Sequence, residues 1–176
     1  MVTILYAVTR TGYFCKKETP DKKVDDLSWM RVPTDRIFFR ELTTLHANQP
    51  ILVGSKTAQV LPKLKDREII SISMCSDRGI PLHYALERYP SAILIGGAKL
   101  LVSAMKPPHR KHINSVITVR LPIGIPSQDD EKDYIKDPLL SFKAPRMLKK
   151  SSQFFMYTDN YEQPTILTEI WRPTWS

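Results

Sequence analysis

Short apolar segments alternate with segments of helical periodicity from Val2 to Arg120. Residues 2–9 form a β-rich apolar run, whereas 35–45 spaces its apolar side chains for one helical face. Short strands joined by helical connections are typical of βαβ units and a mostly parallel sheet. We therefore expect an α/β fold, a central twisted sheet flanked by helices. The expected strands are 2–9, 50–53, 68–73, 92–95 and 113–120, and the expected helices are 35–45, 82–88 and 98–105.

The pattern changes after Arg120. Residues 123–145 are rich in proline and charged residues, and we expect a long surface loop there. Two β-like segments follow, 152–158 and 165–172, which we expect to form a terminal hairpin added antiparallel to the sheet edge. A chain of 176 residues fits one domain with a sizeable core, so we expect residues 1–176 to form a single domain.

The composition points away from membrane and secreted proteins. No apolar run reaches the roughly 18 residues of a membrane span, and the N-terminus lacks the positive start and cleavage site of a signal peptide. Cys15 and Cys75 are too few for a disulfide framework. A cytoplasmic location is the expectation.

The formal net charge of +8 favours anionic partners. Nucleic acid is disfavoured, because the positive charge is spread along the chain and aromatic residues do not interleave with it. An anionic cofactor or substrate explains the charge equally well. His109 and His112 lie three residues apart without a cysteine or acidic partner, so we expect no metal.

Two glycine turns each follow an apolar strand and precede a helix. Gly96 and Gly97 lie between 92–95 and 98–105, and Gly54 is followed by Ser55, Lys56 and Thr57. Glycine lets a backbone approach a phosphate closely, although either turn alone could be a plain tight turn or a capped helix. Two such turns at the carboxyl edge of one sheet would suit a diphosphate-containing cofactor.

Asp35 stands at the head of the helix expected at 35–45, directly after Pro33 and Thr34. Its carboxylate could simply be a favourable charge at a helix N-terminus. If the side chain instead faced a pocket, burial would raise its pKa and suit it to proton chemistry.

The order and spacing of these pieces resemble the dihydrofolate reductase family from Val2 to about Arg120 and again at the terminal hairpin. The motifs that carry the resemblance are Ala7-Val8 with the following Arg10-Thr11-Gly12-Tyr13-Phe14, Leu27-Ser28-Trp29, Pro33-Thr34-Asp35 with Phe39, Val53-Gly54-Ser55-Lys56-Thr57, Leu64-Lys65-Asp66-Arg67, Ile95-Gly96-Gly97-Ala98 and Ile117-Thr118. Each motif is short, and the resemblance rests on their shared order and spacing.

The resemblance implies NADPH-dependent reduction of dihydrofolate to tetrahydrofolate, by a monomer without a metal. Asp35 would hydrogen-bond the pterin and favour protonation of N5, with Thr118 supporting that network and Trp29 holding an ordered water. The implied substrate residues are Leu5, Ala7, Phe39, Leu61, Leu64 and Arg67, with Arg67 taking the carboxylate of the glutamate tail. The implied cofactor residues are Ala7, Phe14, Gly54, Ser55, Lys56, Thr57, Ser73, Ile95, Gly96, Gly97, Ala98 and Lys99.

Several positions depart from the family pattern. Cys15 replaces a glycine of the loop over the active site, and 16–26 is longer and more charged than usual. Ser28 replaces a proline, Ser55 stands where the family often has an arginine that binds the 2′-phosphate, and Leu101 replaces a tyrosine near the nicotinamide.

Two alternatives to a dihydrofolate reductase therefore stay open: a related pterin or pyrimidine reductase, and a non-catalytic protein that reuses the fold. Without the family, Phe39, Leu61 and Leu64 would be ordinary core residues.

Overall fold

The computed structural model describes residues 1–18, 33–45, 48–73, 79–144, 146–156 and 166–175. The strands of the main sheet are β1 (Val2–Thr9), β3 (Ile51–Gly54), β4 (Ile69–Ser73), β5 (Ile80–Pro81), β6 (Ile93–Leu94), β7 (Ile113–Leu121), β9 (Leu148–Met156) and β10 (Ile166–Pro173). A second, two-stranded sheet consists of β2 (Tyr13–Lys16) and β8 (Tyr134–Lys136). The helices are α1 (Pro33–Leu45), α2 (Ser55–Val60), α3 (Leu82–Arg88), α4 (Ala98–Ala104) and α5 (Leu140–Lys143), with short 3-10 turns η2 (His109–His112) and η3 (Glu131–Asp133).

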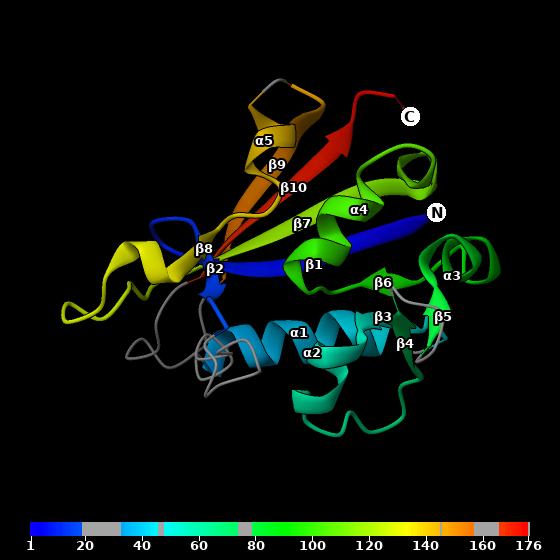
Figure 1. Cartoon of the computed structure of the whole chain (residues 1–176), viewed down its shortest axis with the longest axis horizontal. Coiled ribbons are helices and arrows are strands. Elements are labelled where there is room, and N and C mark those ends of the chain that lie inside the picture. Colours follow the sequence, from blue (N-terminus) through cyan, green and yellow to red (C-terminus); the bar gives the residue numbers. More distant parts are fainter. Residues whose placement is uncertain (19–32, 46–47, 74–78, 145, 157–165, 176) are drawn as a thin grey trace.

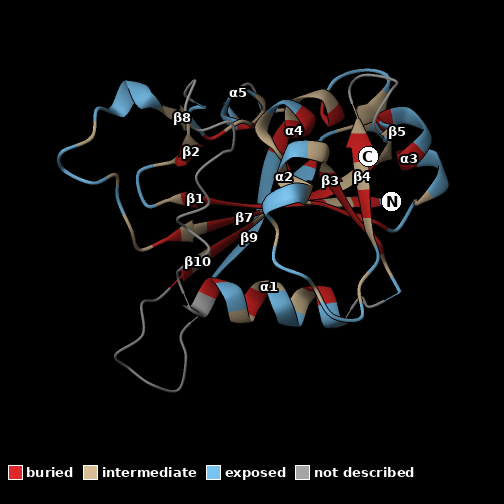
Figure 2. Cartoon of the chain, turned by 60° about the horizontal axis from the view of Figure 1, so that its bottom comes forward, coloured by how far each residue is buried: buried red, intermediate tan, exposed pale blue. Residues whose placement is uncertain are grey.

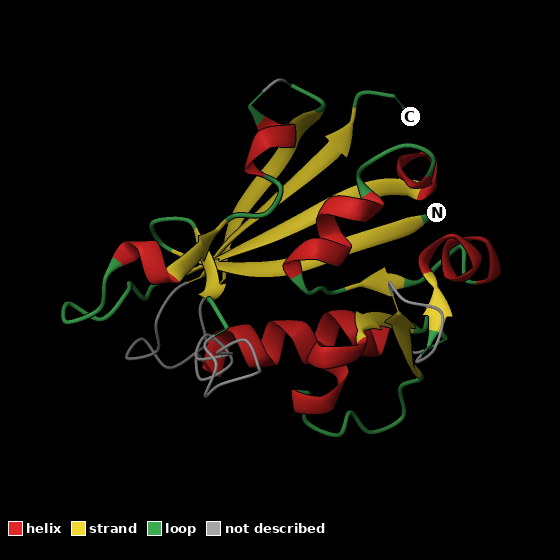
Figure 3. Cartoon of the chain, viewed as in Figure 1, coloured by secondary structure: helices red, strands yellow, loops and turns green. Residues whose placement is uncertain are grey.

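The main sheet has eight strands in the order β5-β4-β3-β6-β1-β7-β10-β9 (Figures 1 and 3). The strands from β5 to β7 pair in parallel, and β10 and β9 add an antiparallel hairpin at the edge next to β7. The carboxyl ends of β1, β3 and β6 therefore meet at one edge of the sheet, where open α/β sheets bind ligands.

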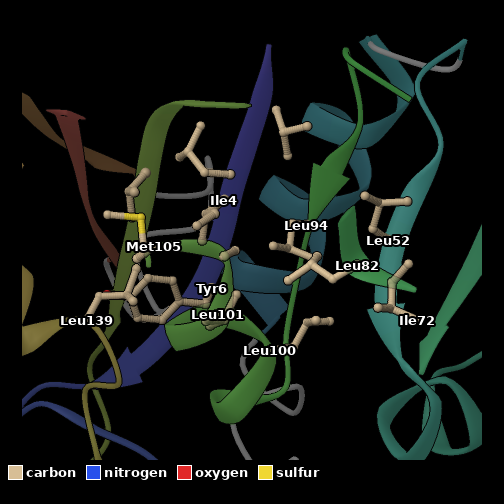
Figure 4. Packing of buried hydrophobic residues seen from close by; sticks show 14 of the residues in the cluster. Ile4, Tyr6, Leu52, Ile72, Leu82, Leu94, Leu100, Leu101, Met105 and Leu139 are labelled. Carbon is tan, nitrogen blue, oxygen red and sulfur yellow. The ribbon is translucent and has the colours of Figure 1, made fainter. Parts of the chain in front are cut away.

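Helices cover both faces of the sheet (Figure 2). On one face α1 packs Phe38 against Leu5 and Ala7 of β1 and Val119 of β7. On the other face α3 and α4 contribute the larger core cluster, part of which Figure 4 shows around Ile4 and Leu94. The alternation of side chains along β1 explains the division, since successive residues of a strand point to opposite faces.

The structure confirms the predicted α/β class and its terminal hairpin. The expected strands and helices all occur, with ends that differ by a few residues, although the expected strand positions 157, 158 and 165 lie outside the described residues. In the hairpin, β9 begins at Leu148, four residues before the predicted start at Ser152. The short strand β5 was not predicted.

The prediction of a long surface loop at 123–145 is wrong in part. This segment contains η3, β8 and α5, and β8 pairs antiparallel with β2, whose residues were themselves assigned to a loop. Asp137 and Leu139 are buried, and the Asp137 amide donates to the Gly12 carbonyl oxygen at 2.8 Å. Polar composition predicted exposure here, but the polar groups find partners in distant parts of the chain.

Candidate active site

A pocket opens between the face of α1 and the carboxyl end of β1. The space between its walls is about 620 Å³ when the open solvent at its mouth is included. Most of its lining is apolar, and Asp35 is its acidic group. The lining residues are Leu5, Tyr6, Ala7, Phe14, Asp35, Arg36, Phe38, Phe39, Leu61, Leu64, Ile95 and Val119.

The carboxyl of Asp35 is removed from water. The residue is only 5% exposed, although it lies in the first turn of a helix whose outer face is solvated. Burial raises the pKa of Asp35 from 3.8 to about 7, because a low-dielectric environment disfavours the charged form. At neutral pH the group can therefore hold or release a proton, which is the property that acid–base chemistry requires.

The two glycine turns lie side by side at the sheet edge. The Gly54 amide donates to the Gly96 carbonyl oxygen at 2.7 Å, and a Cβ added to Gly54 would lie 3.4 Å from the Gly97 nitrogen. Gly96 has φ +129°, a conformation that side-chain-bearing residues rarely adopt. A phosphate can approach backbone of this kind closely, so the turns fit a diphosphate group.

Phe14 joins the pocket to these turns. A Cβ added to Gly96 would lie 3.6 Å from the Phe14 ring, which also meets the Tyr6 ring edge-on at 6.0 Å between centroids. Ile95, directly before the Gly96 turn, lines the pocket as well. The pocket and the predicted cofactor turns are therefore continuous in space.

Thr118 does not join this site. It is fully buried on the opposite face of the sheet, where its hydroxyl accepts a hydrogen bond from Lys143 Nζ at 3.0 Å. The neighbouring residue Val119 points into the pocket instead. Because successive strand residues face opposite ways, the expected contact between Thr118 and Asp35 is not made.

The hydroxyl of Tyr6 belongs to the network on that opposite face. It donates to Asp137 Oδ1 at 2.6 Å and accepts from Lys143 Nζ at 2.9 Å, and Lys143 pairs with Asp137 Oδ2 at 2.8 Å. The side chains of Lys143 and Asp137 are 6% and 3% exposed. Burial, the charge of Asp137 and its hydrogen bond raise the pKa of Tyr6 well above its ordinary value. The ring of Tyr6, which lies beside Leu139 in Figure 4, is thus fixed from behind the pocket.

Arg67 lies outside the pocket lining. Its Nη2 donates to the Arg40 carbonyl oxygen at 3.1 Å and to the Thr44 hydroxyl, both on the last turns of α1, and its Nη1 reaches the Lys65 carbonyl oxygen at 3.4 Å. Its Nε is buried and has no hydrogen-bond partner in the described part of the chain. The guanidinium is therefore attached to α1, and its Nε–H donor is unused by the described residues.

The remaining predicted residues are placed as follows. Lys56, in α2 next to Ser55 and Thr57, pairs with Glu18 at 2.9 Å, and both side chains are exposed. Lys99 is exposed in the first turn of α4, after Ala98, and Ser73 ends β4. Trp29 lies outside the described residues. The sequence prediction missed the pocket residues Tyr6, Arg36, Phe38 and Val119.

The missed residues had partial signals in the sequence. Phe38 and Phe39 are adjacent on an amphipathic helix, and only the second matched a family motif. Val119 follows directly after the residue chosen from the Ile117-Thr118 motif. A shift of one residue along a strand exchanges the two faces, so a two-residue motif could not fix which side chain faces the pocket.

Comparison with known proteins supports the fold. No protein-family model matches the sequence, and no curated protein does. The structure superposes on dihydrofolate reductase from Enterococcus faecalis, solved in complex with NADP(H) and RAB-propyl, with a TM-score of 0.66 over 99% of this chain and 96% of that one. The fold is dihydrofolate reductase-like. The sequences are 15% identical, so this likeness concerns the fold alone and leaves function to the site.

Two further observations bear on partners. Among the described residues, no group of three or more His, Cys, Asp and Glu side chains is placed to hold a metal ion. Within that same part of the chain, no helix has the length and apolar character needed to cross a membrane.

Proposed function

We propose that the protein reduces dihydrofolate to tetrahydrofolate with NADPH, as the sequence resemblance implies. One observation carries the proposal: at the carboxyl edge of a dihydrofolate reductase-like sheet lies an apolar pocket, and among its described lining residues Asp35 supplies the one carboxyl, which is buried and has a pKa of about 7. A flat heteroaromatic ring suits the apolar walls, and a carboxyl that shares a proton suits the ring's nitrogen atoms.

Asp35 would act on the proton side of the reaction. Reduction of the C=N bond of the pterin adds a hydride to carbon and a proton to nitrogen. In its ionised form Asp35 would accept hydrogen bonds from the ring, and in its protonated form it would hold the proton that N5 requires. Leu5, Phe39 and Leu64, which line the pocket, would hold the ring and exclude water.

NADPH would supply the hydride, and the residues at the sheet edge fit its diphosphate. The backbone around Gly54, Gly96 and Gly97 would approach the phosphates, and Lys99 would add positive charge. Lys56 would have to exchange Glu18 for a phosphate, a small cost because exposed ion pairs contribute little. Since Ser55 replaces the arginine common in the family, the preference for NADPH over NADH is part of the test.

Turnover tests the proposal most simply. Purified protein is mixed with NADPH and dihydrofolate, and the loss of NADPH absorbance is followed with and without the substrate. We expect dihydrofolate-dependent oxidation that falls about a hundredfold or more in Asp35→Asn, since positioned acid–base groups contribute about that much. Glu41→Gln, which changes an exposed carboxylate of the same helix, is the control and should retain the wild-type rate. No turnover, or an unchanged rate in Asp35→Asn, contradicts the proposal.

The position of Arg67 favours one second candidate, a reductase of a pterin or pyrimidine without a glutamate tail. Three of the guanidinium's hydrogen bonds go to the protein, and the side chain does not line the pocket. Comparing dihydrofolate with a tail-less dihydropterin separates the two, because equal kcat/KM on both would favour the second candidate. If calorimetry finds that neither NADPH nor methotrexate binds, the fold is reused for a non-catalytic role.

The other expectations remain predictions of the same proposal. A cytoplasmic location, a monomeric state, a single domain and the absence of a metal cofactor all follow from the resemblance and the composition. Gel filtration with light scattering checks the monomer, and activity after treatment with a chelator checks the metal.

A further inference from the structure

The sheet face under α1 contains a buried polar side chain that the proposed site does not use. Thr168 of β10 is 0% exposed, and its hydroxyl has no hydrogen-bond partner among the residues that the structure describes. A buried hydroxyl without a partner is costly, so native proteins usually satisfy such a group with an ordered water or a ligand. Thr43, a buried residue of α1, differs because its hydroxyl donates to the Phe39 carbonyl oxygen at 2.7 Å.

The strand register places Thr168 directly behind the pocket wall. Thr168 pairs with Val119 of β7 on one side and with Phe154 of β9 on the other. The side chains of directly paired residues project from the same face, with Cβ atoms about 5 Å apart. Because Val119 lines the pocket, the Thr168 hydroxyl is one side chain away from it.

Helix α1 places Asp35 over the same part of the sheet as Val119 and Thr168. Phe38 packs in one cluster with Val119, and its ring meets that of Phe154 at 6.5 Å between centroids, so α1 lies over β7, β10 and β9. Asp35 precedes Phe38 by three residues and therefore shares its helix face. Figure 2 shows the first turn of α1 on the side of the sheet where β10 begins. The Asp35 carboxyl therefore lies on the helix face of Phe38, and the Thr168 hydroxyl lies beside Val119, which packs in the same cluster as Phe38.

We propose that Thr168 is a positioning residue for Asp35, with its hydroxyl linked to the carboxyl through one bound water. The family resemblance assigned this supporting hydroxyl to Thr118, which faces the other side of the sheet. In this chain the hydroxyl would come from the next strand. The catalytic meaning of the link rests on the proposed function, whereas the link itself does not.

Because few charged groups surround Asp35, its titration can report on the link to Thr168. Of the described residues that line the pocket with it, Arg36 of α1 and Tyr6 of β1 are charged or titratable, and the Tyr6 hydroxyl is engaged on the opposite face. The other lining elements present apolar side chains, namely Leu5, Ala7, Phe14, Phe38, Phe39, Leu61, Leu64, Ile95 and Val119. A hydrogen bond to the carboxylate favours the ionised form, so losing the link should move the titration of Asp35 to higher pH.

The test is the pH dependence of urea unfolding in four proteins: wild type, Thr168→Val, Asp35→Asn and the double variant. Thr168→Val keeps the shape of the side chain and removes the hydroxyl. We expect it to move the pH midpoint of the stability curve upward by about half a unit or more, and to move nothing in the Asp35→Asn background. Thr118→Val, the control on the opposite face, should leave the midpoint in place.

If Thr168→Val raises the free energy of unfolding by the same amount at every pH, the hydroxyl is an unsatisfied group with no link to Asp35, and the proposal fails. Should the valine variant not fold, Thr168→Ser, which keeps the hydroxyl, is compared with Thr168→Ala. An unmoved midpoint in Thr168→Ala would also overturn the proposal. These curves need no turnover, so their result is independent of whether the protein reduces dihydrofolate.

Discussion

Replacing Asp35 with asparagine should make the protein more stable at neutral and alkaline pH. The side chain is 5% exposed, and burial raises its pKa from 3.8 to about 7. The wild-type folded state therefore must hold either a proton or a buried negative charge above the pKa of the unfolded chain. Asparagine has nearly the same shape and carries no charge.

The magnitude follows from linkage between folding and protonation. A displacement of about three pH units in the pKa of Asp35 corresponds to about 4 kcal/mol. Because the pKa of Asp35 is higher in the folded than in the unfolded state, the folded state binds more protons at pH values between the two. The stability from this group is complete below about pH 4 and is lost as the pH rises through about 7. Between about pH 5 and about pH 8, the free energy of unfolding of the wild type should fall by about 2–3 kcal/mol relative to Asp35→Asn.

Urea unfolding followed by circular dichroism at several pH values measures this difference. Glu41→Gln, with an exposed carboxyl on the same helix, serves as the matched control, and its curve should follow that of the wild type. A constant difference between wild type and Asp35→Asn across this range would refute the reasoning, because it would mean that the carboxyl is ionised in the folded and unfolded chain alike.

Three further predictions concern groups around the site. Lys143→Met should lower the free energy of unfolding by about 3–5 kcal/mol, because it leaves Asp137 buried without its cation; denaturant titration checks this. Gly96→Ala should cost about 1–3 kcal/mol, since φ +129° strains a residue with a Cβ, and calorimetry should also show weaker NADPH binding. Arg67→Lys should raise KM for dihydrofolate and leave a tail-less pterin unaffected, because lysine lacks the fork that binds a carboxylate; equal changes for both substrates would exclude that role.

The strand and helix order could be predicted because burial leaves a direct mark on the sequence. Strands such as Ile51–Gly54, covered by helices on both faces, are nearly continuous apolar runs. The helix α1 carries apolar residues at helical spacing, because one side of it faces the sheet. The second glycine turn was also predictable, since the φ of +129° at Gly96 is a conformation that residues with a side chain rarely adopt.

The orientation of individual side chains could not be predicted in the same way. Thr118 was assigned to the pocket, but a strand exposes alternate residues, and only the tertiary register decides which set faces α1. Likewise, Asp137 lies in a polar, proline-rich segment, and its partner Tyr6 is 131 positions away in the chain. The burial of such a residue depends on contacts that no local pattern records.

The central claim is that Asp35 is the proton-handling group of a dihydrofolate-reducing pocket. Its most direct test is the pH profile of kcat/KM for dihydrofolate, measured with NADPH on the wild type and on Asp35→Asn. For the wild type we predict a kcat/KM that falls as the pH rises through about 7, in line with the pKa of Asp35. For Asp35→Asn we predict a much lower kcat/KM that does not change with pH in this range. A folded wild-type protein that shows no dihydrofolate-dependent oxidation of NADPH at any pH, or an asparagine variant with the wild-type profile, would contradict it.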